Sequence, residues 1–513
     1  MSTEAADGLG WPRCVTILGE PHERCRGVQV RDLGHCLVHL DPAELDNFVS
    51  RLSPSADLDV RGMSLDSALL NRLVSALASP GSSRTTAVVG RALFQGTTFT
   101  EDAYFGSSTF TEAADFRGAT FIKNADFRGA TFNESKLLGP LTADRLELSG
   151  AQFGTAVVIE AESGEVSCQR ARFSGGVEFR IRHGRVDLSE VFLGAASSLA
   201  TSATEFTFRE IFRRKSILVR GTEQQVKGWH ARNSAVDHRP VLTSLRGTDV
   251  SELALTDVDL RWCRFAGAHH LDKLRIEGDS PFLRPPRAWW RSPRQVLFEE
   301  HPWRASRKPT SGWLHATPVD RSGDRVEQVG PDRLAALYRS LRKALEDGKN
   351  EAGAGDFYLG EQEARRRAKG TSTIERMVLW AYWLVSGYGQ RALRALVALA
   401  GVVTVVTVVL VICGLPAPAP ASQSTTVTYP VSGGGQQTLT TTSDVAPQLP
   451  PGSARWTWDR VDSSARIALG AVVFRDAGQK LTTSGVWTVM VARFVGPILL
   501  ALAALAVRAR VKR

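Results

Sequence analysis

The sequence has none of the short motifs that identify the common classes of enzyme. It contains no G-x-G-x-x-G dinucleotide motif and no phosphate-binding P-loop, and it lacks the H-E-x-x-H pattern of metalloproteases and the G-x-S-x-G pattern of serine hydrolases. Each of these chemistries needs its residues at a fixed spacing, so the missing patterns argue against those mechanisms. We therefore predict that the chain is not an enzyme, and we assign no catalytic or cofactor-binding residue.

Neither sign of charge prevails enough to indicate one partner. The 513 residues include 63 Lys and Arg against 53 Asp and Glu, and the net charge of +10 is spread along the chain. Such a balance suits anionic lipid as well as nucleic acid. The first residues, MSTEAADGLGWPRC, are acidic and lack an apolar run, so we expect no signal peptide here.

Long apolar runs are confined to the C-terminal part of the chain. Residues 395–415 are uncharged and residues 486–507 contain one charge, Arg493, and each run is long enough to cross a hydrocarbon core of about 30 Å. Basic residues precede the first run and follow the second, which by the positive-inside rule places both termini in the cytoplasm. We expect a two-span protein of a bacterial inner membrane, with residues 416–485 outside the membrane.

A short repeat occupies the N-terminal half. The segment ADFRGATF occurs twice, eleven residues apart, and phenylalanines recur at alternating steps of five and six residues with a small residue two positions before each. Neither a helix nor a simple alternating strand has this period, whereas a solenoid with inward-pointing central residues does. The predicted core residues are Phe94, Phe99, Phe105, Phe110, Phe116, Phe121, Phe127 and Phe132.

The repeat resembles the pentapeptide-repeat family, whose unit is A-(D/N)-L-x-x with Phe allowed at the centre. The two A-D-F-R-G segments at 114–118 and 125–129 carry the resemblance, and the six-residue steps depart from the strict unit. The resemblance implies a mainly β fold, a right-handed quadrilateral β-helix, over about 87–275. An ordinary β-sandwich is the alternative. Cys263 and His270 would then occupy solenoid positions.

A solenoid presents a long rigid surface, and the resemblance implies a binding or scaffolding role. Some relatives are acidic mimics of DNA. Here Arg117, Lys123 and Arg128 accompany Asp115 and Asp126. This mixed surface argues against DNA mimicry.

The N-terminal cysteines have the order of a metal site. Cys14, Cys25, Cys36 and His39 form C-x10-C-x10-C-x2-H, and three thiolates with one imidazole complete a tetrahedral ligand set for zinc. All four ligands come from the protein, so the predicted zinc is structural. His22 or His35 could replace one cysteine, and the alternative is three buried or free cysteines in a small cap.

A second resemblance covers the segment before the membrane. PDRLAALYRSLRKALEDGKNEAGAGDFYLGEQEARRRAKG predicts a helical hairpin and is similar to a LYRxLRK…DFYxGE…RR segment of membrane-anchored pentapeptide-repeat proteins. Some of these carry ion-channel-like ends, and some are labelled membrane-associated oxidoreductases, a label that no residue here supports. The run Arg365, Arg366, Arg367 and Lys369 is predicted to contact anionic headgroups. The Trp- and Arg-rich stretch at 280–330 is expected to form a capping loop rather than to bind nucleic acid.

We therefore predict a membrane-anchored scaffold that presents its solenoid to an unknown protein partner. The alternative is an ion channel gated by the solenoid, in which residues 463–474 could form a short pore helix. A filter-like re-entrant loop and four-fold oligomeric assembly would favour this alternative. No TVGYG-like filter is present, Arg493 is unfavourable in a cation path, and Pro497 would kink the second span. The expected domains are a Cys/His cap (1–86), the solenoid (87–275), a capping linker (276–330), a helical hairpin (331–375), an interfacial segment with the first span (376–415), an extracytoplasmic loop (416–485), and the second span with a basic tail (486–513).

Overall fold

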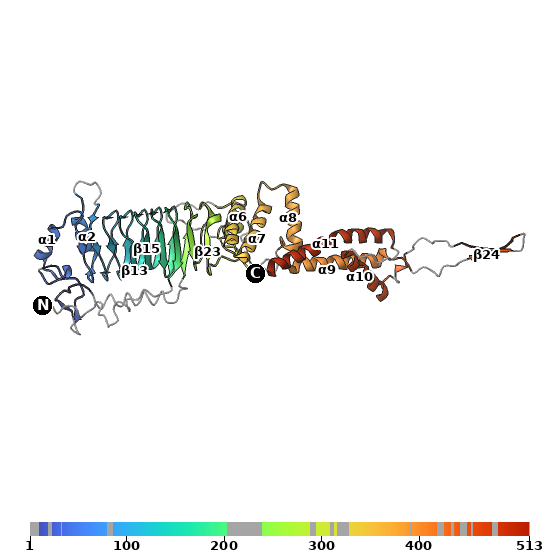
Figure 1. The fold of residues 1–513 in the computed structure, drawn as a ribbon, viewed down its shortest axis with the longest axis horizontal. Coiled ribbons are helices and arrows are strands. Elements are labelled where there is room, and N and C mark those ends of the chain that lie inside the picture. The colour runs from blue at the N-terminus through green and yellow to red at the C-terminus, as the bar shows by residue number, and fades with distance from the viewer. Residues whose placement is uncertain are drawn as a thin grey trace. The chain divides into compact units, whose positions relative to one another are not determined.

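The structure is a computed structural model, and Figure 1 shows its ribbon. It divides the chain into two compact units, residues 1–369 and 370–513, which are described separately. The residues that the structure describes are 10–18, 23–31, 33–79, 86–202, 239–287, 294–307, 312–314, 328–389, 392–417, 425–431, 435–441, 449–452, 455–473 and 481–511.

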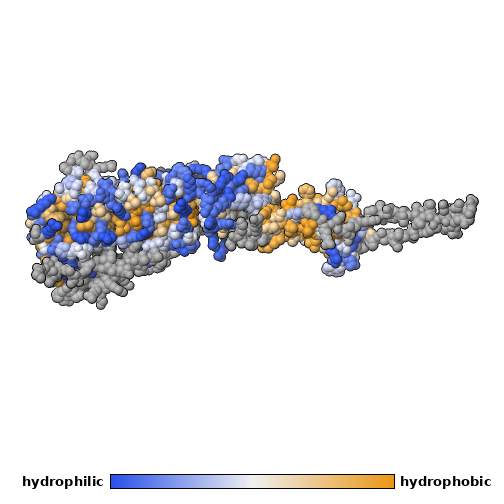
Figure 2. All heavy atoms as spheres, viewed as in Figure 1, coloured by the Kyte–Doolittle hydropathy of each residue, from blue (hydrophilic) through white to orange (hydrophobic). Residues whose placement is uncertain are grey.

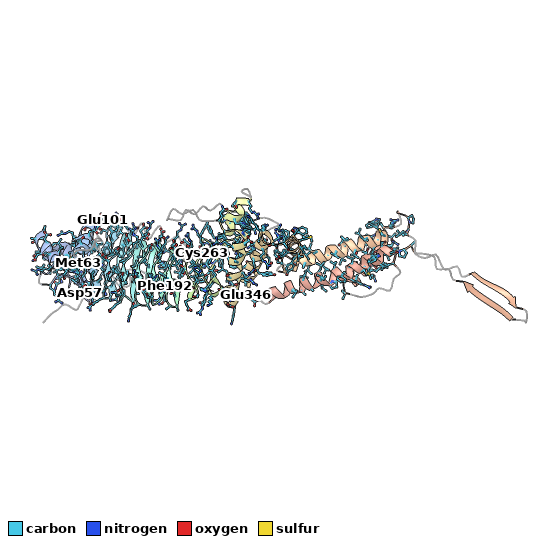
Figure 3. The ribbon with its side chains drawn as sticks, turned by 90° about the horizontal axis from the view of Figure 1, so that it is seen from above. Asp57, Met63, Glu101, Phe192, Cys263 and Glu346 are labelled. Carbon is cyan, nitrogen blue, oxygen red and sulfur yellow. The ribbon has the colours of Figure 1, made fainter. Side chains whose placement is uncertain are left out.

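The first unit is a parallel β-solenoid of about seven turns, which confirms the predicted fold class. Its coils contribute strands to three parallel sheets, and its side chains fill the space between them (Figure 3), with Met63 near the start of the stack and Cys263 near its end. The pairing begins at Leu58, inside the segment assigned above to the cap. The three-stranded sheet contains β3 (Leu58–Asp59), β6 (Ala92–Leu93) and β10 (Ala114–Asp115). The six-stranded sheet contains β5 (Val88–Val89), β9 (Thr109–Phe110), β12 (Thr131–Phe132), β14 (Gln152–Phe153), β16 (Arg172–Phe173) and β19 (Phe192–Leu193). The twelve-stranded sheet contains β4 (Ser64–Leu65), β7 (Thr98–Phe99), β8 (Ala103–Tyr104), β11 (Thr120–Asp126), β13 (Leu137–Glu147), β15 (Val157–Ser167), β17 (Val177–Ile181), β18 (Gly184–Asp187), β20 (Ser197–Thr201), β21 (Pro240–Ser244), β22 (Leu253–Thr256) and β23 (Arg275–Glu277).

The register explains the alternating five- and six-residue steps. Phe99 pairs with Phe121, 22 residues later, so one coil of the Phe-rich part holds two steps of each kind. The rings stack on their copies in the next coil; Phe99 and Phe121, for example, have centroids 4.5 Å apart and nearly parallel planes. Farther along, Phe153 pairs with Phe173, and the coil shortens to 20 residues. The strict pentapeptide spacing is thus restored after the Phe-rich coils.

The structure places every predicted core phenylalanine inside the solenoid, each at most 1% exposed. The small residues two positions earlier are buried as well, as expected for side chains that pack closely beside the stacked rings. These small residues are Ala92, Thr97, Ala103, Ser108, Ala114, Ala119, Ala125 and Ala130.

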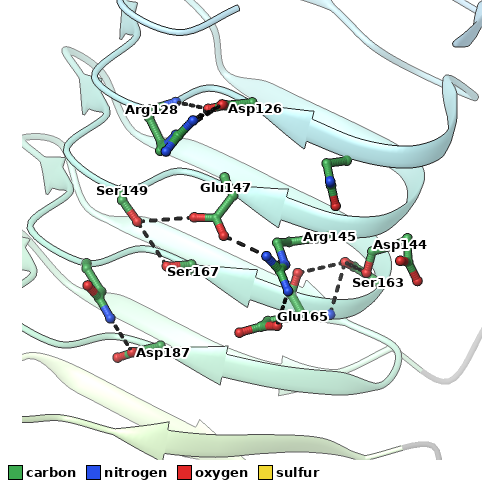
Figure 4. A network of polar contacts seen from close by, with 12 residues as sticks. Asp126, Arg128, Asp144, Arg145, Glu147, Ser149, Ser163, Glu165, Ser167 and Asp187 are labelled. Atoms are coloured by element: carbon green, nitrogen blue, oxygen red, sulfur yellow. Dashed lines mark hydrogen bonds and ion pairs between the residues drawn. The ribbon is translucent and has the colours of Figure 1, made fainter. Parts of the chain in front are cut away.

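Polar residues line the outer face of the twelve-stranded sheet in register (Figure 4). Asp126 pairs with Glu147 on the next strand, and Glu147 pairs with Ser167. Asp126 accepts hydrogen bonds from the backbone N–H and from the guanidinium of Arg128. Neighbouring charges of opposite sign therefore neutralise one another on this face, as the mixed sequence predicts.

Helices and short strands cover the two ends of the solenoid. At the start lie the β1 (Ile17–Leu18) and β2 (Glu23–Arg24) hairpin, the short helix η1 (Leu37–His39), and helices α1 (Pro42–Ser50) and α2 (Ser67–Ala76). Asp41 and Glu44 form a capping box at the start of α1, where Pro42 supplies the first helical residue. At the far end η2 (Leu271–Lys273) and α5 (Glu300–Arg307) precede the predicted helical hairpin, which is α6 (Pro331–Asp347) and α7 (Glu351–Arg367).

The second unit consists of helices and one hairpin. It contains α8 (Thr373–Ser386), α9 (Ala392–Val409), the π-helical turn η4 (Leu410–Gly414), β24 (Thr425–Val431), β25 (Gly435–Thr441), α10 (Trp458–Val472) and α11 (Thr483–Val511). Two stretches, Leu393–Gly414 and Thr483–Leu505, are long and apolar enough to cross a membrane. Figure 2 shows hydrophobic side chains gathered over these helices.

Candidate functional site

The four predicted metal ligands meet in the small subdomain at the start of the solenoid. Cys14 precedes β1 and Cys25 follows β2, and the hairpin brings these two flanking segments together, where the N–H of Cys14 donates to the carbonyl oxygen of Gly27. Cys36 stands directly before η1, and the N–H of His39 donates back to the carbonyl of Cys36. All four ligand atoms lie within 4.8 Å of one another.

The distances between these atoms fit a tetrahedral metal site. The sulfur atoms of Cys25 and Cys36 are 3.8 Å apart, and Nδ1 of His39 lies 3.2 Å from the sulfur of Cys36 and 3.5 Å from that of Cys14. A zinc ion about 2.3 Å from each sulfur and about 2.1 Å from a nitrogen places sulfur atoms about 3.8 Å apart and sulfur about 3.6 Å from nitrogen. The arrangement therefore needs little change to hold zinc.

The surroundings of the cluster support the same role. Cys14 and Cys36 are fully buried, and Cys25 accepts a hydrogen bond from the backbone N–H of Gly27 at 3.4 Å. A Cβ atom on Gly27 would lie 2.9 Å from Cβ and 3.0 Å from the sulfur of Cys36. Only glycine fits between the two ligand-bearing segments without displacing Cys36, a constraint that the cysteine spacing did not reveal.

The contact between the Cys25 and Cys36 thiols shifts their pKa values in opposite directions. A hydrogen bond from Cys36 lowers the pKa of Cys25 to about 5, and the same contact raises the pKa of the Cys36 thiol far above its ordinary value. Two thiolates this close repel each other unless a cation lies between them.

His35, one of the two alternative histidines, does not join this cluster. Nδ1 of His35 lies 3.0 Å from the hydroxyl oxygen of Thr16, which in turn contacts the sulfur of Cys14. His35 therefore lies behind the ligand set, and His22 lies outside the described residues.

A second cluster, of buried charges, lies between α5 and the hairpin. Nη2 of Arg294 is 2.6 Å and 2.8 Å from the two carboxylate oxygens of Glu300, and the hydroxyl group of Tyr338 donates to the same carboxylate. Arg304 joins Glu300 to Glu363. Burial alone would raise the pKa of Glu300, but the two guanidinium groups lower it to about 2. The sequence predicted the hairpin that contains Tyr338 and Glu363, but not this cluster.

The predicted membrane-surface residues differ in exposure. Lys369 is exposed, whereas the three arginines are half-buried. Arg367 lies 3.6 Å from Glu363 and over the ring of Trp303, and burial lowers its pKa to about 10. This arginine is therefore engaged within the first unit.

The two predicted intramembrane residues lie on α11. Arg493 is half-buried and Pro497 stands inside the helix. Their positions fall within the apolar stretch Thr483–Leu505.

Comparison with known proteins supports the assignment of the Phe-rich segment as a pentapeptide repeat. Residues 94–137 match the family model described as pentapeptide repeats (9 copies). No curated protein and no solved structure matches the chain.

Proposed function

We propose that the chain is a membrane-anchored interaction protein. Its two apolar helices hold it in the bilayer, and its solenoid presents a rigid surface to a protein partner. The single observation that carries this proposal is the presence of a pentapeptide-repeat solenoid and two candidate spans in the same chain. Stacked coils give an extended surface rather than a cleft for chemistry.

The solenoid offers exposed aromatic side chains on an otherwise charged surface. Tyr104 is 47% exposed, Phe192 is 46% exposed and Trp262 is 44% exposed. Exposed aromatic residues are enriched at the centres of protein interfaces. They are therefore the positions at which a bound partner should be detected.

Site-specific photo-crosslinking in the native membrane tests this proposal. A photoreactive amino acid replaces Tyr104, Phe192 or Trp262 in the full-length chain, with Trp458 of α10 as the control position outside the solenoid. We expect an adduct with the same protein from at least one solenoid position and none from Trp458. Labelling no stronger than background at all three solenoid positions would contradict the proposal that a protein partner binds the solenoid.

Membrane anchoring is tested separately. Carbonate washing of membranes should leave the full-length chain in the pellet, because two spans of this hydropathy do not dissociate from a bilayer. Release of the chain into the supernatant would show that the two helices do not span the bilayer.

Within this function, the Cys/His cluster would hold a structural zinc ion that orders the start of the solenoid. Metal analysis of the purified chain should give about one zinc per chain, and cobalt in its place should give the intense visible absorption of tetrahedral thiolate coordination. Cys36→Ser should lose both signals. Cys263→Ser is the matched control, since Cys263 is also fully buried but lies in the solenoid. Metal-free wild-type protein would refute the zinc site.

A second candidate is ion conduction, favoured by the packing of α10 against both candidate spans. Liposomes containing the full-length chain should then show an ion flux that scales with protein and changes in Arg493→Ala. No flux with several cations at either polarity would leave the helices as an anchor only.

A further inference from the structure

Helix α10 lies in the chain between the two candidate spans and packs against both of them. Its residues Ile467, Ala468 and Ala471 are buried in one apolar cluster with Leu410 of η4 and Ala492 of α11. Leu410 and Ala492 belong to the two apolar stretches that can cross a membrane. A helix that leads from one span to the next outside the bilayer would not reach these residues.

The N-terminal end of α10 is fixed at the end of the first span. The guanidinium group of Arg460 donates to the carbonyl oxygen of Leu415 at 2.7 Å and to that of Pro416 at 3.0 Å. At this level the two spans meet, since a Cβ atom on Gly485 would lie 2.6 Å from the carbonyl oxygen of Gly414. This end of α10 therefore lies at the boundary where the first span ends and the second begins.

The C-terminal end of α10 lies far from that boundary. A Cβ atom on Gly496 would lie 2.9 Å from Cα of Val472, so the last turn of α10 contacts α11 at this glycine. Gly496 follows Thr483 by 13 residues, which at 1.5 Å per residue is about 20 Å along the helix axis. The hydrocarbon core is about 30 Å thick, so this contact lies beyond its middle.

The chain then returns to the boundary. The backbone N–H of Thr482 donates to the carbonyl oxygen of Gly414 at 3.0 Å, and the Thr482 hydroxyl donates to that of Cys413 at 2.5 Å. Val473 and Thr482 are therefore at opposite depths although they are close in sequence.

We propose that α10 is a re-entrant membrane helix that inserts its C-terminal half into the hydrocarbon layer, with its exposed apolar side chains in contact with lipid acyl chains. This inference rests on the proposed function, because it requires α9 and α11 to span the bilayer. It changes the expectation that all of 416–485 lies outside the membrane.

The exposed side chains of α10 change character along the helix as this insertion requires. Nearest the boundary, Asp459 and Asp462 are exposed, and Asp462 forms an ion pair with Arg466 at 2.8 Å. Deeper along the same face, Leu469 is 57% exposed and Val473 is 69% exposed. Charged residues thus lie at headgroup level, and the exposed apolar residues lie within the acyl-chain layer.

Arg493 is placed at the depth where α10 ends. It precedes Gly496 by three residues and follows Val489 by four, and both of these residues face α10. A cation is favourable near the C-terminal end of a helix, where backbone carbonyl groups carry partial negative charge. The re-entrant helix therefore gives a physical reason for an arginine at this depth.

Membrane depth along α10 tests the proposal directly. Single spin labels are attached to cysteines that replace Asp462, Leu469 or Val473 in the full-length chain reconstituted in lipid bilayers, in a Cys413→Ser background. The five other cysteines are buried, and the unsubstituted background serves as the blank. We expect accessibility to oxygen to rise, and accessibility to a water-soluble nickel chelate to fall, from Asp462 to Val473.

Labels on the spans separate this proposal from the proposed function. Val405 is 62% exposed on α9 and Phe494 is 79% exposed on α11, so labels there should report hydrocarbon. If they do, and the Val473 label remains accessible to nickel at the level of Asp462, the re-entrant helix is refuted and the anchor stands. If the Val405 and Phe494 labels are accessible to nickel, membrane anchoring itself fails and the re-entrant helix fails with it.

Discussion

Arg294 and Glu300 form an ion pair in which both side chains are almost completely removed from solvent, at 4% and 1% exposure. Tyr338 of α6 and Glu363 of α7 contact the same pair. A buried charge is tolerated only with such partners. The pair therefore joins the segment that follows the solenoid to both helices of the hairpin, and its integrity should govern the stability of this end of the first unit.

Removing the charge of Glu300 should destabilise the chain strongly. Glu300→Gln leaves Arg294 buried without its carboxylate, which typically costs about 3–5 kcal/mol in the free energy of unfolding. Calorimetric melting of the full-length protein in detergent measures the change. The control is Glu346→Gln, which removes an exposed i,i+4 partner of Arg342 and should cost no more than about 1 kcal/mol. Equal effects of the two substitutions would contradict the importance of the buried pair.

The neighbouring His301 should make stability depend on pH. Burial lowers the pKa of His301 from its ordinary 6.5 to about 4, even though Glu300 opposes the shift and Arg294 adds to it. The folded state therefore favours neutral His301. The stability that this preference adds to the folded state is complete above pH 6.5 and is lost as the pH falls towards 4. The expected loss is on the order of 3 kcal/mol, at about 1.4 kcal/mol per pKa unit.

This pH dependence is checked by unfolding the full-length chain between pH 7 and pH 5, above the range in which Glu300 titrates. Nδ1 of His301 accepts from the N–H of Leu314, and His301→Asn retains an acceptor without a group that titrates in this range. The variant should show a smaller slope of stability against pH than the wild-type protein. An unchanged slope would show that His301 is not the responsible group.

A single ring in the Phe-rich coils should matter more than an exposed ring on the same coils. Phe116 stacks on Phe94 with centroids 4.7 Å apart and packs edge-on against Phe105 and Phe127. Phe116→Ala removes these contacts and leaves a cavity, with an expected cost of about 3–5 kcal/mol by chemical unfolding. Tyr104→Ala is the comparison, since Tyr104 is 47% exposed and its loss should cost much less. Similar costs would argue against a closely packed core.

The packing of the two candidate spans should require glycine at the point where the helices approach each other. In Gly485→Ala the added methyl group would lie 2.6 Å from the carbonyl oxygen of Gly414, and backbone atoms cannot move aside as a flexible side chain can. The helices must separate, with an expected loss of about 1–3 kcal/mol. Gly401→Ala on α9 is the control, because among the described residues nothing beyond its own stretch of helix backbone lies within 4 Å of its added methyl group. A melting temperature in detergent that falls equally in both variants would contradict the close approach.

The sequence alone determined the features that repeat or that depend on local spacing. The phenylalanine period specified a solenoid because only stacked coils place a large side chain inward every five or six residues. Hydropathy specified two candidate spans, and the order C-x10-C-x10-C-x2-H specified the candidate metal ligands, because each is a property of residue type and interval.

Only the tertiary structure decided which residues far apart in sequence share an environment. It brought Arg294 to Glu363, placed Gly27 between Cys25 and Cys36, and set the coil at 22 residues before it shortens to 20. It also placed Val472 beside Gly496, a contact that makes α10 a candidate re-entrant helix. These relationships depend on how coils and helices pack, and packing is a property of contacts that no local period encodes.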